Sequence, residues 1–118
     1  MKTIPKMVMI GTREVPVKMV TMDSNLYGQY STVPDFEISL NKANSPSQMM
    51  ETFWHELIHA IHDYNATQTL IMNEIAAAQY DGRAPDATAF NVEEQMTDGF
   101  AKIFLQVITD NKLLDLTA

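Results

Sequence analysis

The hydrophobic pattern of this chain changes its period near residue 45, and this change restricts the folds open to it. Before that point, apolar and β-branched residues form short runs at 7–10, 15–22 and 36–40, separated by turn residues. Such runs are typical of strands joined by turns, and they predict a small antiparallel sheet. Beyond residue 45, apolar residues recur every three or four positions, which is typical of helices with one buried face. Strands followed by helices predict an α+β fold.

We expect one domain, 1–118, with strands mainly in 1–44 and helices mainly in 45–118. A chain of this length can bury a hydrophobic core, and its 46% hydrophobic and 19% charged residues are typical of globular proteins. No apolar stretch reaches the length of a membrane span or of a signal peptide, so a cytoplasmic location is expected. The net charge of −7 argues against nonspecific binding to nucleic acid or to a membrane surface and leaves open a basic protein partner. The sequence does not indicate an oligomeric state.

About three helices are expected in the second part of the chain. The first begins at 45–48, whose Ser-Pro-Ser-Gln sequence supplies an N-cap, a proline at the first helical position and a glutamine three residues after the cap. A second helix is expected from Asn65 or Thr67. A third is expected from Asn91, after a polar loop at 81–88.

The segment His55-Glu56-Leu57-Ile58-His59 has the spacing of a metal-binding motif. Residues four apart lie on the same face of a helix, so the imidazoles of His55 and His59 can reach one zinc ion at about 2.0–2.1 Å. Glu56 is placed to take a proton from a zinc-activated water as that water attacks a peptide carbonyl. A chance occurrence of this motif is rare in a chain with three histidines. The motif therefore predicts a metal centre with Glu56 as the general base.

The third ligand of this centre is less clearly indicated. Because the chain has no cysteine, zinc, expected as one ion per chain, must be held by histidine and carboxylate. Glu94 is favoured, since Asp98 one turn later can accept a hydrogen bond from the ring N–H of a ligand histidine. Glu93 and His62 are weaker candidates. The alternative for Glu94 is a capping box with Asn91, in which it binds a main-chain amide instead of a metal.

Two other sets of side chains are of interest. HExxH peptidases often use a tyrosine, histidine or arginine to stabilise the oxyanion, and Tyr27, Tyr30 and Tyr64 are candidates for that role, although a buried packing role is favoured for Tyr64. Arg13 lies near a turn and is expected to be a solvated charge.

Four features of the chain occur in an order known from one protein family: the Tyr27-Gly28 step, the strand at 36–40, the Ser-Pro-capped helix with its motif at 55–59, and the acidic helix start at 94–98 followed by Phe100-Ala101. In this order they resemble the minimal ImmA/IrrE-like metallopeptidases, compact HExxH proteins encoded by bacteriophages and mobile elements. The resemblance spans most of the chain and implies Glu94 as the third zinc ligand, supported by Asp98. The HExxH and Glu-x-x-x-Asp spacings are specific, whereas the other two features are weak alone. The stretch 65–90 is longer than in the shortest relatives.

The resemblance also implies a compact minimal zincin fold and hydrolysis of a peptide bond in a protein substrate, often a repressor or another regulator. In such enzymes the strand before the active-site helix is a sheet edge beside the metal. Its counterpart here consists of Phe36, Glu37, Ile38, Ser39 and Leu40, which would bind an extended peptide through their main chain. The alternation of apolar residues in this segment fits a core strand equally well.

Two rival functions remain open from the sequence. One is a catalytically silent zinc-containing phage or host-interaction protein, in which four protein ligands would close the site. The other is a binding module in which the HExxH is accidental. A phage-encoded protein would act in the cytoplasm of the bacterial host.

Overall fold

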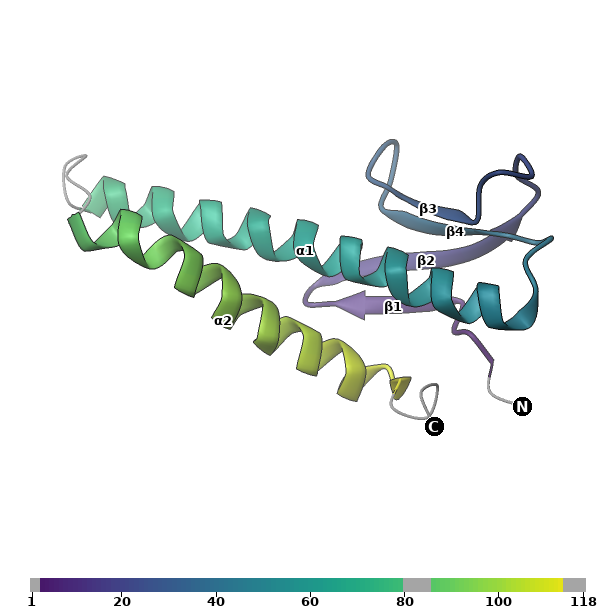
Figure 1. Ribbon diagram of the computed structural model, residues 1–118. Coiled ribbons are helices and arrows are strands. Elements are labelled where there is room, and N and C mark those ends of the chain that lie inside the picture. The colour runs from purple at the N-terminus through teal and green to yellow at the C-terminus, as the bar shows by residue number, and fades with distance from the viewer. Residues whose placement is uncertain (1–2, 80–85, 114–118) are drawn as a thin grey trace.

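The computed structural model describes the backbone of residues 3–79 and 86–113, and the side chains of 3–71 and 96–113. Within these ranges four strands precede two helices: β1 (Met7–Ile10), β2 (Arg13–Val20), β3 (Gly28–Ser31), β4 (Glu37–Asn41), α1 (Pro46–Gln79) and α2 (Asp86–Asp110). The predicted order of strands and then helices is confirmed, and the fold is α+β (Figure 1).

The strands form one mixed sheet in the order β1-β2-β4-β3. β1 and β2 pair antiparallel, as do β3 and β4, but β2 and β4 are parallel neighbours with Val17 opposite Ile38. The predicted all-antiparallel sheet is therefore wrong, because β4 lies between β2 and β3 and runs parallel to β2. Ile38 and Leu40 are fully buried, which favours an inner position for β4. The shorter, more polar β3 forms the edge.

Two long helices take the place of the three that the sequence predicts. α1 continues through Asn65 and Thr67, where a second helix is expected to begin. The buried Asn65 side chain donates to a main-chain carbonyl of α2 at 2.7 Å, and the Thr67 hydroxyl donates to the carbonyl of Asp63 at 3.0 Å. Because neither side chain caps a new helix, the backbone stays helical. α2 begins at Asp86, so Asn91 lies inside it and not at its start.

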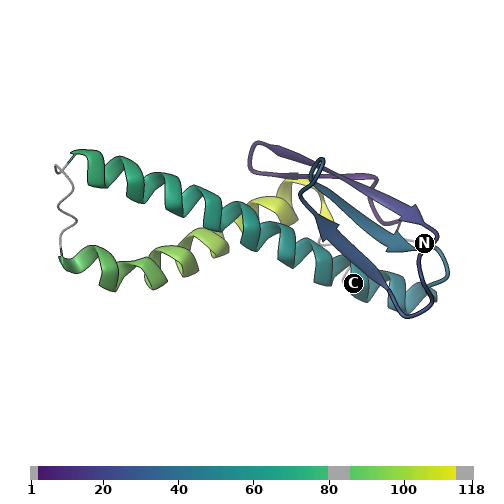
Figure 2. The ribbon, with the colours of Figure 1, turned by 90° about the horizontal axis from the view of Figure 1, so that it is seen from above.

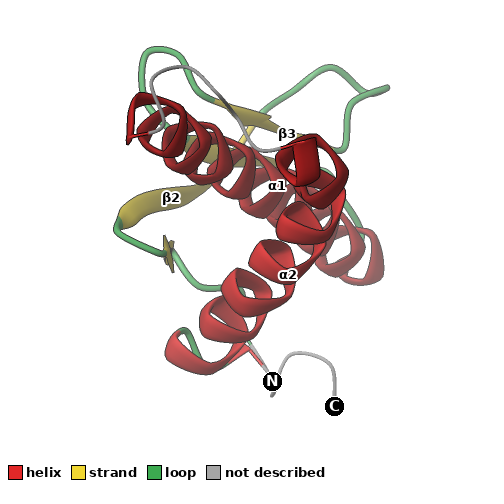
Figure 3. Cartoon of the chain, turned by 90° about the vertical axis from the view of Figure 1, so that its left-hand side faces the viewer, coloured by secondary structure: helices red, strands yellow, loops and turns green. Residues whose placement is uncertain are grey.

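α1 lies across one face of the sheet with its N-terminal half and extends beyond the sheet with its C-terminal half, beside α2 (Figures 1 and 2). The molecule is consequently elongated, with extents of 53 × 30 × 21 Å. Figure 3, a view from the end of the molecule, shows that α1 and α2 are not parallel but cross. The core lies between the sheet, α1 and the end of α2, and its largest fully buried side chains are Val8, Ile10, Val15, Ile38, Leu40, Phe53, Leu57, Ile61, Val107 and Leu113.

Neither helix, over the residues that the structure describes, combines the length and apolar character that crossing a membrane requires.

The outer edge of β1 is covered by side-chain amides at the end of α2. The Oδ1 atom of Asn111 accepts the N–H of Met9 at 2.9 Å, and its Nδ2 donates to the carbonyl of Met9 at 3.0 Å. One turn earlier, Gln106 accepts the N–H of Gly11 at 2.9 Å. Asn111 thus occupies the place of a further strand and closes this edge of the sheet.

Candidate metal centre

The helix that carries the HExxH motif begins where the sequence predicts. Ser45 is its N-cap, with Oγ accepting the N–H of Gln48 at 3.2 Å, and Pro46 is its first residue. A row of buried side chains fixes the rotation of α1 against the sheet: Phe53, Leu57, Ala60 and Ile61. With that row turned inward, the side chains of His55 and His59 are exposed.

The imidazole rings of His55 and His59 converge on one point. Their Nε2 atoms lie 3.1 Å apart, and their ring centroids lie 4.7 Å apart with the planes at 82°. Two nitrogens bound to a tetrahedral zinc ion at 2.0–2.1 Å would lie about 3.3 Å apart. The spacing of the two rings therefore fits a shared metal ion.

Glu56 is the buried acid of this cluster. It is only 6% exposed, and its Oε1 lies 4.0 Å from Nε2 of His55. Among the side chains that the structure describes, its Oε2 is the one buried polar atom without a hydrogen-bond partner. Native proteins rarely leave such an atom unpaired, because burying it without a partner costs free energy. The three residues offer ligand atoms within 4.8 Å of one another, which fits a metal ion with a proton acceptor beside it.

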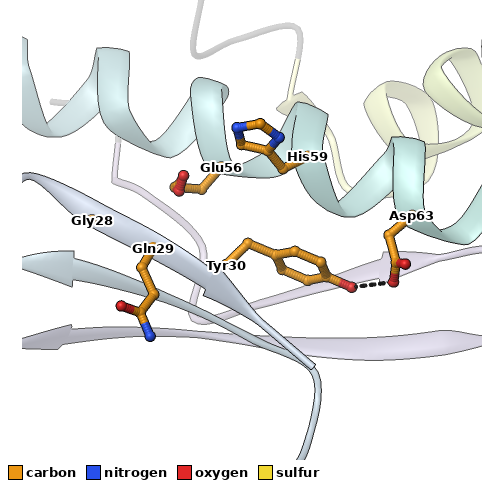
Figure 4. A pocket seen from close by; sticks show the side chains of 6 residues that line it. All are labelled: Gly28, Gln29, Tyr30, Glu56, His59 and Asp63. Carbon is orange, nitrogen blue, oxygen red and sulfur yellow. Dashed lines mark hydrogen bonds between the residues drawn. The ribbon is translucent and has the colours of Figure 1, made fainter. Parts of the chain in front are cut away.

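A groove runs between α1 and β3 on both sides of Glu56. One cavity of about 470 Å³, shown in Figure 4, is lined by Gly28, Gln29, Tyr30, Glu56, His59 and Asp63. A second cavity of about 450 Å³ is lined by Asn25, Leu26, Tyr27, Gly28, Gln48, Glu51, Thr52, His55 and Glu56. Since Gly28 and Glu56 line both cavities, the cluster of His55, Glu56 and His59 lies at the middle of the groove.

The sheet edge beside this groove is β3, and not the segment 36–40 that the resemblance implies. β4 lies between β2 and β3, so its main-chain groups pair inside the sheet, and Ile38, Ser39 and Leu40 are buried as in a core strand. The N–H of Asn41 donates to the carbonyl of Tyr27 at 2.9 Å. Because hydrogen-bonded pairs alternate along an antiparallel ladder, the main-chain groups of Gly28 and Tyr30 point away from β4.

A hydrogen-bonded network joins α1 to β2 and β3 beside the first cavity. Asp63 lies one turn beyond His59, and its Oδ2 accepts from the hydroxyl of Tyr30 and from Nη1 of Arg13, both at 2.9 Å. Arg13 is not the solvated charge that the sequence predicts, since its side chain is 14% exposed and lies 3.7 Å from the ring centroid of Phe36. Burial, and then the hydrogen bond to Asp63, raise the pKa of Tyr30 to about 12, so its hydroxyl keeps its proton at neutral pH.

Asp63 is not among the site residues predicted from the sequence, although its spacing carries a signal. His55, His59 and Asp63 are spaced four apart and therefore share one face of a helix. No such signal exists for Arg13, which reaches Asp63 from 50 residues away in the sequence.

The remaining predicted site residues do not join the described cluster. The ring of His62 stacks on Phe100, with centroids 4.4 Å apart, and is not among the clustered ligand atoms. Asp98 is exposed and, within the described side chains, makes no hydrogen bond to either histidine of the motif. The side chains of Glu93 and Glu94 lie outside the described residues, so the third ligand stays a prediction.

Comparison of the chain with protein-family models, with curated proteins and with solved structures finds no match. The case for a metal centre therefore rests on the geometry of His55, Glu56 and His59.

Proposed function

We propose that this chain is a zinc-dependent endopeptidase of the HExxH class, similar to the minimal ImmA/IrrE-like metallopeptidases. The observation that carries the proposal is the 3.1 Å approach of the Nε2 atoms of His55 and His59 beside the buried Oε2 of Glu56, which has no hydrogen-bond partner among the described side chains. A purely structural zinc site is closed by four protein ligands and needs no general base. The cavities on both sides of the cluster support a site that admits a substrate.

Glu94 is the proposed third zinc ligand, with Asp98 supporting a ligand histidine. Two histidines and a glutamate form a known ligand set for catalytic zinc. Two residues after Glu94, the carbonyl of Met96 accepts a hydrogen bond from Asn65, which lies six residues beyond His59, or about 9 Å along α1. The side chain of Glu94 itself lies outside the described residues, so its role as a ligand depends on the sequence motif. The metal content of Glu94→Gln tests this role separately from the rest of the centre.

Glu56 supplies the proton transfers of the proposed reaction. When bound, zinc acts as a Lewis acid that lowers the pKa of a coordinated water to about 7. Glu56 would accept a proton from a water molecule in the groove as that water forms a C–O bond to the peptide carbonyl carbon and the C=O π bond opens. It then gives that proton to the amide nitrogen as the C–N bond breaks, and the carboxylic acid that forms passes its own proton to the released amine, so the products are a carboxylate and an ammonium ion. The burial of Glu56 beside His55 holds its carboxylate in place for both steps.

The open edge of β3 supports an extended peptide as the substrate. The main-chain groups of Gly28 and Tyr30 can hydrogen-bond to a peptide that adds to the sheet. The opposite edge is closed by Asn111, so of the two edges of the described sheet only β3 is open to such an addition. A peptide bound at β3 would pass Glu56 at the middle of the groove. By analogy with the family, we propose a regulatory protein as the natural substrate.

Hydrolysis of a complex peptide mixture tests the proposal. Zinc-loaded wild type and zinc-loaded Glu56→Gln, matched for metal content, are incubated with peptides from a digested bacterial proteome, and new termini are identified by mass spectrometry. We expect new termini with wild type, their loss on chelation, their return with zinc, and none with Glu56→Gln. Wild type that binds zinc and cuts nothing would contradict the proposal and support a silent zinc protein.

A further inference from the structure

We propose that Asp63 makes the groove selective for peptides with a basic side chain two or three residues N-terminal to the bond that is cut. The position relative to that bond rests on the proposed function. The selection itself is a property of binding, and it can be measured whether or not the peptide is hydrolysed.

The carboxylate of Asp63 is held in a fixed position through one of its two oxygens. Its Oδ2 accepts from both Tyr30 and Arg13 at 2.9 Å, whereas no hydrogen bond to its Oδ1 is found among the described residues. The side chain is 37% exposed and lines the cavity beside His59 and Glu56 (Figure 4). A fixed, charged acceptor at the end of a cavity is suited to a cationic donor, because charge-assisted hydrogen bonds are the stronger ones.

Arg13 forms an ion pair with Asp63, and the described contact is made through Oδ2, at 2.9 Å. Its guanidinium carbon lies 3.7 Å from the ring centroid of Phe36 and 5.2 Å from that of Tyr64, so much of its surface faces aromatic rings. No lysine or arginine is found among the described residues that line either cavity. With a net charge of −7 on the chain, the groove is expected to attract cations.

The geometry of β3 directs a peptide side chain toward Asp63. The hydroxyl of Tyr30 reaches Asp63, so the Tyr30 side chain lies on the α1 face of the sheet. A peptide residue directly opposite Tyr30 lies on the same face, and its side chain points to the same end of the groove. The ring of Tyr30 borders the cavity between Gln29 and Asp63 and offers an apolar surface for the stem of a lysine or arginine (Figure 4).

The position of this side chain relative to the cut bond follows from the direction of the strands. β3 runs from Gly28, which lies against Thr52, toward Tyr30, which lies against Asp63. A peptide that pairs antiparallel with β3, the more stable arrangement, therefore has its N-terminal part at Asp63. Asp63 is seven residues beyond Glu56, or about 10 Å along the helix, which corresponds to about three residues of extended chain.

Binding of peptide pools to a non-hydrolysing protein tests the inference. Three pools of fluorescent ten-residue peptides have lysine, norleucine or glutamate at one central position and random residues elsewhere. Fluorescence anisotropy with zinc-loaded Glu56→Gln gives the apparent affinity of each pool. We expect the lysine pool to bind about tenfold more tightly than the norleucine pool, and the glutamate pool to bind most weakly. Adding Asp63→Asn should reduce the lysine preference to less than about twofold.

Glu14→Gln is the matched control, because it removes one charge from an exposed position of β2 outside the groove. It should keep the full preference for lysine. Thermal melting of each variant verifies folding. If Asp63→Asn folds poorly, the affinities of the lysine and norleucine pools for the protein that keeps Asp63 still decide the question. Equal binding of the two pools, no binding of any pool, or a preference that survives Asp63→Asn would overturn the inference.

The outcomes for the two proposals are separable. A lysine preference in binding together with no hydrolysis by wild type would support the selectivity and contradict the peptidase. Hydrolysis at sites without an upstream basic residue, together with equal binding of the pools, would support the peptidase and overturn the selectivity.

Discussion

Replacing Asn111 with alanine should destabilise the fold by opening the edge of β1. The Asn111 side chain makes three hydrogen bonds: with the N–H of Met9 at 2.9 Å, the carbonyl of Met9 at 3.0 Å and the carbonyl of Val107 at 2.9 Å. A hydrogen bond within a protein contributes about 0.5–1.5 kcal/mol net. Because these groups are only partly buried, water can replace some of the lost hydrogen bonds. We therefore expect Asn111→Ala to lower the unfolding free energy by about 2 kcal/mol in total. For a chain of this length, that loss lowers the melting temperature by about 8 °C.

Urea unfolding and hydrogen exchange measure this effect together. Asn111→Ala should lower the unfolding free energy by the stated amount and should speed the exchange of the Met9 amide, which loses its acceptor. Thr109→Ala, an exposed change on the same helix end, is the control and should alter stability by less than about 0.5 kcal/mol. A loss below about 0.5 kcal/mol in Asn111→Ala, with the Met9 amide still protected, would refute the role of Asn111 as a substitute strand.

Three further predictions test other parts of the structure. In Gly28→Ala, the new Cβ would lie 2.6 Å from Cγ2 of Thr52, which is too close for an ordinary contact. The unfolding free energy should therefore fall by about 1–3 kcal/mol. An unchanged midpoint of urea unfolding would contradict the close approach of β3 to α1. The pKa of Tyr30 is about 12 in the folded protein against an ordinary 10.0, so the folded state holds this proton more tightly and the unfolding free energy falls as the pH rises from 10 to 12. Thermal melts across this range should show a smaller fall for Tyr30→Phe, and equal falls would contradict the network with Asp63. Zinc at a hundredfold excess over its Kd should stabilise wild type by about 2.7 kcal/mol and leave His59→Ala unchanged, while an equal shift in both proteins would place zinc elsewhere.

The local features of α1 could be predicted from the sequence because they depend on neighbouring residues. Ser45 caps the helix and Pro46 begins it, as expected from their order alone. His55 and His59 meet because four residues make about one helical turn, and this relation holds in any fold that keeps the helix.

The rest of the site depends on contacts between distant residues. The position of β4 inside the sheet follows from the burial of Ile38 and Leu40 against helices that the strand sequence does not reveal. α1 continues through Asn65 because that side chain binds α2, a contact 31 residues away in the sequence. Arg13 is fixed by Asp63 across 50 residues, so its burial could not be inferred from the turn beside it.

The metal content of the purified protein tests the central claim most directly. Wild type, His59→Ala, Glu94→Gln and Glu93→Gln are purified without added metal, and zinc per chain is measured by mass spectrometry. We predict one zinc per chain in wild type and in Glu93→Gln, and its loss in His59→Ala and Glu94→Gln. Zinc lost in His59→Ala but kept in Glu94→Gln would retain the centre and reject Glu94 as its ligand. Wild type that binds no zinc, even after incubation with excess metal, would contradict a metal centre at His55, Glu56 and His59.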